Sequence, residues 1–189
     1  EASKAKGDEA AYLSALASFN QHRWGEAESS FSKILGSKTL DKEYVAYALF
    51  YTGYAQYQKG DYSKSVASLN RFVSENPNHQ FVWSALMTVA RAAAFAKNSD
   101  EAISASQKAI KVAKNESEKN EATILAAGIL SDSKKYDEAL AVLAPYIARR
   151  SEFGYECKYR SAEILVQQGK TEAADKYFAE LAANNDKAA

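Results

Sequence analysis

The chain has 189 residues, 47% of them apolar and 25% charged, so it can bury a substantial hydrophobic core. Lysine plus arginine and aspartate plus glutamate each number 24, which leaves no basic excess for a phosphate backbone and makes nucleic acid an unexpected partner. Two prolines and eight glycines leave no flexible linker, and no apolar run reaches the roughly 18 residues of a membrane span, so we expect no direct membrane insertion by this chain.

One short pattern occurs five times along the chain. It consists of a polar turn, a small residue and, usually, a large apolar residue four positions later. The small residues of successive copies are 38, 37, 37 and 35 positions apart. A period in the thirties with two helical stretches per repeat is typical of a helical solenoid, in which each repeat buries its apolar face against its neighbours. In chain order, the five small marker residues are Ala27, Ser65, Ala102, Ala139 and Ala174.

This period predicts ten helices in five repeats and no strand. A small residue midway along the first helix of a repeat lets the second helix approach closely, and large residues of the second helix fill the groove beside it. We therefore expect an all-α fold with a polar lead-in over 1–7, one solenoid domain over 8–184 and a tail over 185–189. The repeats are expected at about 8–40, 41–79, 80–116, 117–151 and 152–184.

The second repeat carries a family resemblance. Residues 46–78, AYALFYTGYAQYQKGDYSKSVASLNRFVSENPN, resemble a tetratricopeptide repeat (TPR) almost position for position, with Gly53 at the small position of the first helix and Pro77 at the close. Only Gly169 repeats the turn glycine, Gly60. The resemblance implies a right-handed superhelical α-solenoid that binds another protein or a peptide. The small position is kept in the other four repeats by Ala15, Ala90, Gly128 and Ala162.

The first and last repeats resemble repeats of bacterial envelope proteins. Residues 11–35 are similar to the repeats of the envelope protein that accompanies the Tol-Pal system, and residues 154–181 look like the closing repeat of periplasmic proteins attached to the secretion translocon. The resemblance implies a protein that is periplasmic, or membrane-anchored and facing the periplasm, with a cytoplasmic location as the alternative. The chain starts at Glu1 and its only methionine is Met87, so we expect the natural start, with a possible membrane anchor, to lie ahead of it.

We expect neither catalysis nor a bound metal or cofactor. The sequence contains no HExxH, CxxC, GxGxxG or GxxxxGK[ST] motif. Nucleophilic catalysis needs a nucleophile and a base within hydrogen-bond reach. His22, His79 and Cys157 fall in three different repeats, so we expect these side chains to lie far apart.

The candidate binding surface is aromatic. On the expected first helix of the second repeat, aromatic residues follow steps of three, four and three, which places them along one stripe. In the TPR family this stripe lines the concave groove. Tyrosine offers a large apolar face and a hydroxyl at little entropic cost, which suits an extended peptide or a partner helix. The candidate partner-binding residues are Tyr12, Leu16, Phe19, Tyr47, Phe50, Tyr54, Tyr57, Met87 and Arg91.

Several roles remain open for this stripe. The rings can pack on one another inside the solenoid, or the same surface can be self-complementary in a homo-oligomer. A small-ligand site would need polar groups that converge on a deep pocket, and here only Arg91 and the tyrosine hydroxyls are available. We therefore expect a noncatalytic scaffold or adaptor that grips another protein, with a homo-oligomeric module and a small-ligand-binding protein as the alternatives.

Overall fold

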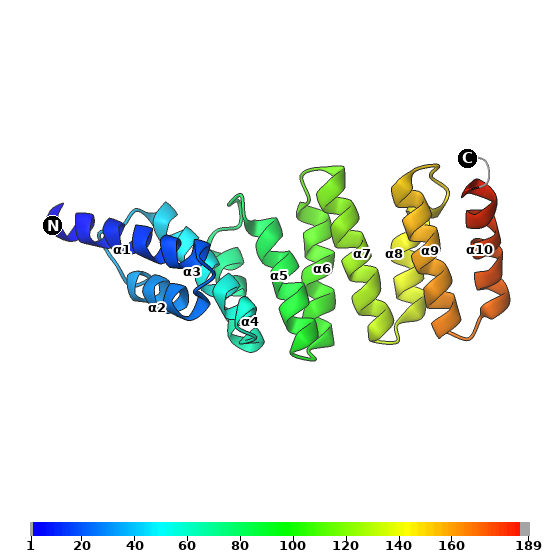
Figure 1. Ribbon diagram of the computed structural model, residues 1–189, viewed down its shortest axis with the longest axis horizontal. Coiled ribbons are helices and arrows are strands. Elements are labelled where there is room, and N and C mark those ends of the chain that lie inside the picture. Colours follow the sequence, from blue (N-terminus) through cyan, green and yellow to red (C-terminus); the bar gives the residue numbers. More distant parts are fainter. Residues whose placement is uncertain (1, 186–189) are drawn as a thin grey trace. The chain divides into compact units, whose positions relative to one another are not determined.

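The computed structural model describes residues 2–185, which form ten α-helices (Figure 1). The predicted all-α fold and its ten helices are confirmed over this part of the chain. The first helix begins at Ala2, so the residues expected as a polar lead-in, 1–7, are helical from Ala2 onward. The helices are α1 (Ala2–Asn20), α2 (Trp24–Ile34), α3 (Lys42–Gln58), α4 (Tyr62–Glu75), α5 (Val82–Phe95), α6 (Ser99–Val112), α7 (Glu116–Asp132), α8 (Tyr136–Ile147), α9 (Glu152–Gln167) and α10 (Thr171–Asn185).

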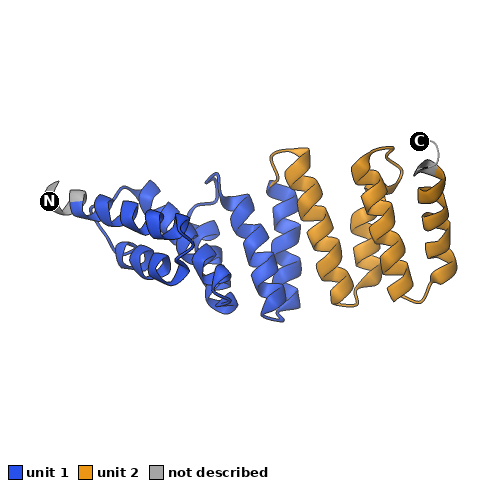
Figure 2. Cartoon of the chain, viewed as in Figure 1, with its two compact units in different colours: residues 1–112 blue, residues 113–189 orange. Residues whose placement is uncertain are grey.

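The helices form two compact units (Figure 2). Unit 1 is Glu1–Val112 and holds α1 to α6, whereas unit 2 is Ala113–Ala189 and holds α7 to α10. Within each unit every helix packs on its neighbour in the chain, and the first helices of adjacent repeats also meet: α1 with α3, α3 with α5, and α7 with α9. The continuity of one solenoid over 8–184 and its right-handed sense stay predictions.

The five marker residues lie in the core. Each of them has 0% of its surface exposed. The close approach of α3 and α4 is visible at Gly53, where an added Cβ would lie 2.6 Å from the Cγ atom of Leu69. The small residue expected in the fourth repeat, Gly128, is instead exposed with open space around it, and its neighbour Ala127 is buried. The expected position therefore lies one residue too far along α7.

All five helix-to-helix turns inside the repeats share one conformation. Each turn has one residue with positive φ, and the amide of the next residue donates a hydrogen bond of 2.8 to 2.9 Å to the carbonyl five positions earlier. This arrangement is the Schellman motif, which satisfies carbonyls at a helix end. The turn therefore forms even where glycine is absent. The positive-φ residues are His22, Gly60, Lys97, Lys134 and Gly169.

A polar network joins α2, α3 and α4. The Glu28 carboxylate accepts a hydrogen bond of 3.0 Å from Gln56 Nε2 and pairs with Lys59, while Gln56 Oε1 accepts a hydrogen bond of 2.8 Å from Ser68 Oγ. Burial raises the pKa of Glu28, but the hydrogen bonds from Lys59 and Gln56, with the charge of Lys59, outweigh burial and lower that pKa. Folding therefore favours the ionised form of this carboxyl.

We expect Glu28→Gln to lower the free energy of unfolding by about 0.5 to 1 kcal/mol at pH 7. Because the folded pKa is lowered, this contribution is present above the unfolded value near 4.5 and is lost as the pH falls through the folded pKa. Urea unfolding of the two proteins should therefore show a gap at pH 7 that closes towards pH ~3. Glu26→Gln, at an exposed position of the same helix, is the control and should cost less. A gap independent of pH would contradict this account.

Candidate functional site

Three of the nine predicted partner-binding residues are buried. Tyr12 and Phe50 are each 6% exposed, and Met87 is 1% exposed. The Tyr12 ring packs on Phe31 of α2 with the ring centroids 5.8 Å apart, and Phe50 packs on Phe72 of α4 at 5.5 Å. Burial raises the pKa of Tyr12 to about 12. Tyr12 and Phe50 hold first helices against second helices. Because all three side chains are buried, they offer no surface to a partner and leave the candidate site.

The other six predicted residues are half-buried. Leu16 and Phe19 pack around the core between α1 and α2. The hydroxyl of Tyr47 accepts a hydrogen bond of 2.7 Å from Gln80 Nε2, and its ring meets His79 edge-on at 5.0 Å. Tyr47 is therefore tied to the loop between α4 and α5. The half-buried set is Leu16, Phe19, Tyr47, Tyr54, Tyr57 and Arg91.

Ring contacts connect the first helices of three repeats in unit 1. They run from Phe19 of α1 to Tyr54 and Tyr57 of α3, and on to Phe95 at the end of α5, with centroid separations of 5.7, 6.3 and 6.3 Å. Tyr62, at the start of α4, stacks on Phe95 at 4.9 Å with an interplanar angle of 19°. The Phe95 side chain is 60% exposed. We call these five residues the aromatic surface.

Sequence reasoning missed two members of the aromatic surface, Tyr62 and Phe95. Phe95 follows Arg91 by four residues, so helical periodicity could have placed it on the stripe. Tyr62 gives no such signal, because it lies on a second helix and reaches the surface only through the turn at Gly60. The signal for Phe95 was therefore present, and the signal for Tyr62 was not.

The aromatic surface consists of phenylalanine and tyrosine side chains, and the charge of Arg91 lies near Tyr57. Burial raises the pKa of Tyr57, and the nearby charge of Arg91 opposes this shift only in part. The Tyr57 hydroxyl therefore keeps its proton at neutral pH and can donate as well as accept a hydrogen bond. Apolar ring faces, neutral hydroxyls and a guanidinium can together contact apolar side chains and the carbonyl groups of a peptide.

The residues considered for catalysis are placed in unrelated surroundings. His22 is exposed in the turn after α1, with its ring centroid 5.0 Å from that of Trp24. The Nδ1 atom of His79 accepts a hydrogen bond of 3.1 Å from the Phe81 amide. Cys157 of α9 is fully buried, and burial raises its pKa to about 11. Within residues 2–185, no group of three or more His, Cys, Asp or Glu side chains is placed to hold a metal ion.

The length and polarity of the helices can be compared with the needs of a membrane span. Each helix in residues 2–185 is too short or too polar to cross a lipid bilayer. A membrane helix needs about 20 consecutive, predominantly apolar residues.

Several solved structures share the fold. The TPR-like repeats of a Podosopora anserina protein assigned as a kinesin light chain superpose with a TM-score of 0.73 at 15% identity, over 95% of each chain. A crystal structure of MamA gives a TM-score of 0.73 at 17% identity, over 93% of this chain and 91% of that chain. MamA from AMB-1 gives 0.69 at 15% identity, over 96% of this chain and 93% of that chain. At these identities the likeness concerns the fold.

A family model covers most of the sequence. No curated protein matches the chain. The model described as the tetratricopeptide repeat-like domain matches residues 38–189, which is more than half of the chain and includes the second repeat. Proteins with this fold generally serve as protein-protein interaction scaffolds. This chain belongs to the tetratricopeptide repeat-like domain family.

Proposed function

We propose that this protein is a noncatalytic scaffold that grips a partner protein or peptide on the aromatic surface of unit 1. The observation that carries the proposal is the run of ring contacts across α1, α3 and α5, which ends on Phe95 with 60% of its side chain exposed. Aromatic side chains gathered at a surface mark contact sites, and tyrosine is enriched among the residues that carry most of the binding energy.

The chemistry of the aromatic surface favours a peptide with apolar side chains. The rings of Tyr54 and Tyr57 are half-buried, so they are held in place by packing and lose little freedom on binding. Their hydroxyls are available to backbone groups of an extended segment. The half-buried predicted residues Leu16, Tyr47 and Arg91 would border this contact. We include them in the proposed binding set.

We also propose a location in a bacterial cell envelope, either free in the periplasm or anchored and facing it. The support is the resemblance of residues 11–35 and 154–181 to repeats of envelope proteins. A cytoplasmic location is the alternative. The compartment of the partner protein distinguishes the envelope from the cytoplasm, so an experiment that identifies the partner also tests the location.

A photo-activated cross-linking residue at position 95 tests this proposal in the source cell. We expect a covalent adduct with another protein when the cross-linker replaces Phe95, and none when it replaces Val112, which is 38% exposed on α6. Mass spectrometry then identifies the partner and its compartment. Absence of an adduct at position 95 would overturn the proposal. An adduct of twice the mass of this chain would favour the homo-oligomer.

Truncation of the exposed ring should separate binding from stability. We expect Phe95→Ala to weaken binding of the cross-linked partner at least tenfold, or about 1.4 kcal/mol, because the outermost ring of the surface is lost. The free energy of unfolding should change by less than about 1 kcal/mol, since the side chain is mostly exposed. Calorimetric titration and urea unfolding measure the two quantities. Val166→Ala, at a 47% exposed position on α9, is the control and should leave binding unchanged.

A further inference from the structure

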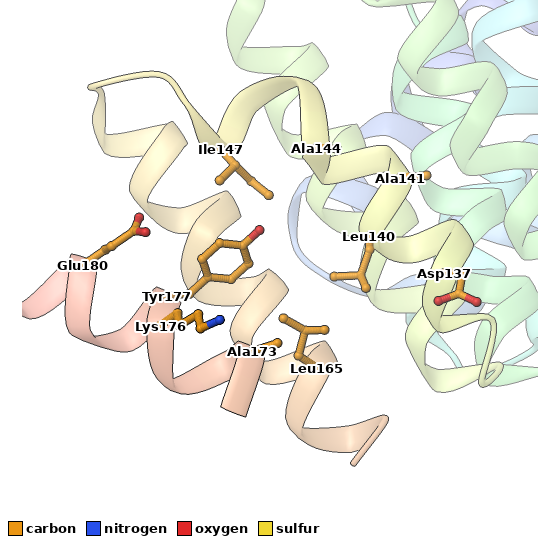
Figure 3. A pocket seen from close by; sticks show the side chains of 10 residues that line it. All are labelled: Asp137, Leu140, Ala141, Ala144, Ile147, Leu165, Ala173, Lys176, Tyr177 and Glu180. Carbon is orange, nitrogen blue, oxygen red and sulfur yellow. The ribbon is translucent and has the colours of Figure 1, made fainter. Parts of the chain in front are cut away.

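Unit 2 has a groove of its own, between α8 and α10. Its volume is about 510 Å³, and Leu165 of α9 contributes to its lining (Figure 3). Apolar side chains, chiefly Leu140, Ile147 and Tyr177, face the groove, and small residues such as Ala144 leave space along α8. The groove shares no residue with the aromatic surface. Any role it has is additional to the proposed function.

The lining residues form a stripe on each of the two helices. On α8 they are at positions 137, 140, 141, 144 and 147, and on α10 at 173, 176, 177 and 180. Steps of three and four mark one face of a helix, and two such stripes side by side are the surface on which a third helix packs. The groove is thus shaped for a helix.

The two helices run in the same direction along the groove. Near the start of α8, the Asp137 carboxylate accepts a hydrogen bond of 2.9 Å from Gln168 Nε2, just before α10 begins. At the end of α8, Ile147 lies with Glu180 in the lining of a second hollow. The N-termini of α8 and α10 therefore share one end of the groove. The C-termini of the two helices, which carry partial negative charge, share the other end.

The end of the groove at the C-terminus of α8 is rich in cations. The second hollow, of about 300 Å³, shares Ile147 and Glu180 with the groove and adds Arg149, Arg150 and Lys158. Lys158 pairs with Glu180 at 2.7 Å. The lining of this hollow therefore contains three cationic side chains and one carboxylate.

One of these arginines already has partners that orient it. The Arg149 guanidinium lies 4.7 Å from the centre of the Tyr146 ring, and its Nη1 atom is 3.6 Å from a Glu116 carboxylate oxygen. Arg150 is exposed beside it. An acidic group at this end of the groove would meet the Arg149 guanidinium, which has partners, and the exposed guanidinium of Arg150.

We propose that this groove binds an amphipathic α-helix of a partner protein, antiparallel to α8 and α10, with its acidic first turn at Arg149 and Arg150. The apolar stripe of the helix fills the space above Leu165 and Ala144. Antiparallel docking sets the positive N-terminus of the bound helix beside the C-termini of α8 and α10, and acidic residues are favoured in a first turn. The mode is the helix-in-groove recognition known from other proteins.

The test uses a phage-displayed library of 20-residue helical peptides, selected on the full chain. We expect enrichment of peptides with apolar residues at steps of three and four and with Asp or Glu in the first turn. Failure to enrich any peptide would overturn the proposal. So would winning peptides that carry their acidic residues in the last turn, because they would require the opposite direction.

Variants of the chain then locate the binding site of the selected peptide. Fluorescence anisotropy should show at least tenfold weaker binding to Ala144→Arg, which fills the groove, and about fivefold weaker binding to Arg150→Glu. Ala179→Arg, at an exposed position of α10 outside the groove, should bind as the unchanged chain does. Circular dichroism confirms that the variants fold. Unchanged affinity for Ala144→Arg would overturn the proposal, as would a dimer of this chain that Ala144→Arg dissociates, because the groove would then hold a second copy.

Discussion

Phe72→Ala should lower the free energy of unfolding by about 3 to 5 kcal/mol, because it removes a fully buried ring of α4 in unit 1. The Phe72 ring packs on Phe50 of α3 at 5.5 Å and on His79 at 5.1 Å. The cavity left by alanine would lie beside the rings of Phe50 and His79. Urea unfolding followed by tryptophan fluorescence measures the loss, since Trp24 and Trp83 both lie in unit 1.

Phe72→Leu is the matched control for this change. Leucine keeps most of the apolar volume, so the loss should be below about half of that for alanine. The two losses decide whether packing volume at this position stabilises unit 1. A loss under ~1 kcal/mol for Phe72→Ala would show that the site relaxes and that the Phe72 ring is not a main support of the core.

Gly154→Ala should destabilise unit 2 by about 3 kcal/mol, at the upper end of ordinary overpacking. A Cβ atom at Gly154 would lie 2.1 Å from the Arg149 carbonyl oxygen and 3.1 Å from the Tyr146 carbonyl oxygen. These are backbone atoms of the last turn of α8 and of the connection to α9, so no side-chain rotation can relieve the clash. The change would also disturb the cap at which Ser151 Oγ accepts a hydrogen bond of 3.2 Å from the Gly154 amide.

Gly128→Ala is the control in the same unit, and it should have the opposite sign. Gly128 lies inside α7 with nothing within 4 Å of an added Cβ. Alanine is the better helix former by about 1 kcal/mol, so this variant should be more stable than the unchanged chain. Thermal unfolding followed by circular dichroism compares the two. If Gly154→Ala were also stabilising, the close approach of α9 to the α8–α9 connection would be excluded.

The fold was largely predictable because each repeat contains its own copy of the pattern of polar turn, small residue and large apolar residue. The marker residues, such as Ala27 and Ala174, could be aligned by their spacing alone, and all of them are buried. The left-handed residues His22, Lys97 and Lys134 were not predictable, since none of them is a glycine. Their conformation costs about 1 to 2 kcal/mol in isolation and is held by hydrogen bonds that a sequence does not display.

The candidate site was less predictable because periodicity shows which face of a helix a residue lies on, but not whether other helices bury it. Tyr54 and Phe50 share one stripe, but Phe50 is covered by Phe72 and by Phe81, whose centroids lie 5.5 and 4.7 Å away. Covering residues come from other helices and cannot be read from the stripe. The groove of unit 2 was missed for another reason. The predicted site rested on first helices alone, although Ala144 of α8 and its apolar neighbours carry a helical pattern.

The five repeated turns also bear on how fast the chain folds. Each turn joins two helices that pack on one another, and every helix contact in residues 2–185 joins helices at most two apart in the chain. Contacts of such low sequence separation cost little loop-closure entropy, and proteins dominated by them fold in microseconds to milliseconds. A nucleus can form in any hairpin and grow outward to its neighbours. The order in which the repeats form therefore depends on the stability of each repeat and of its interfaces with neighbours, so several routes can lead to the same native state.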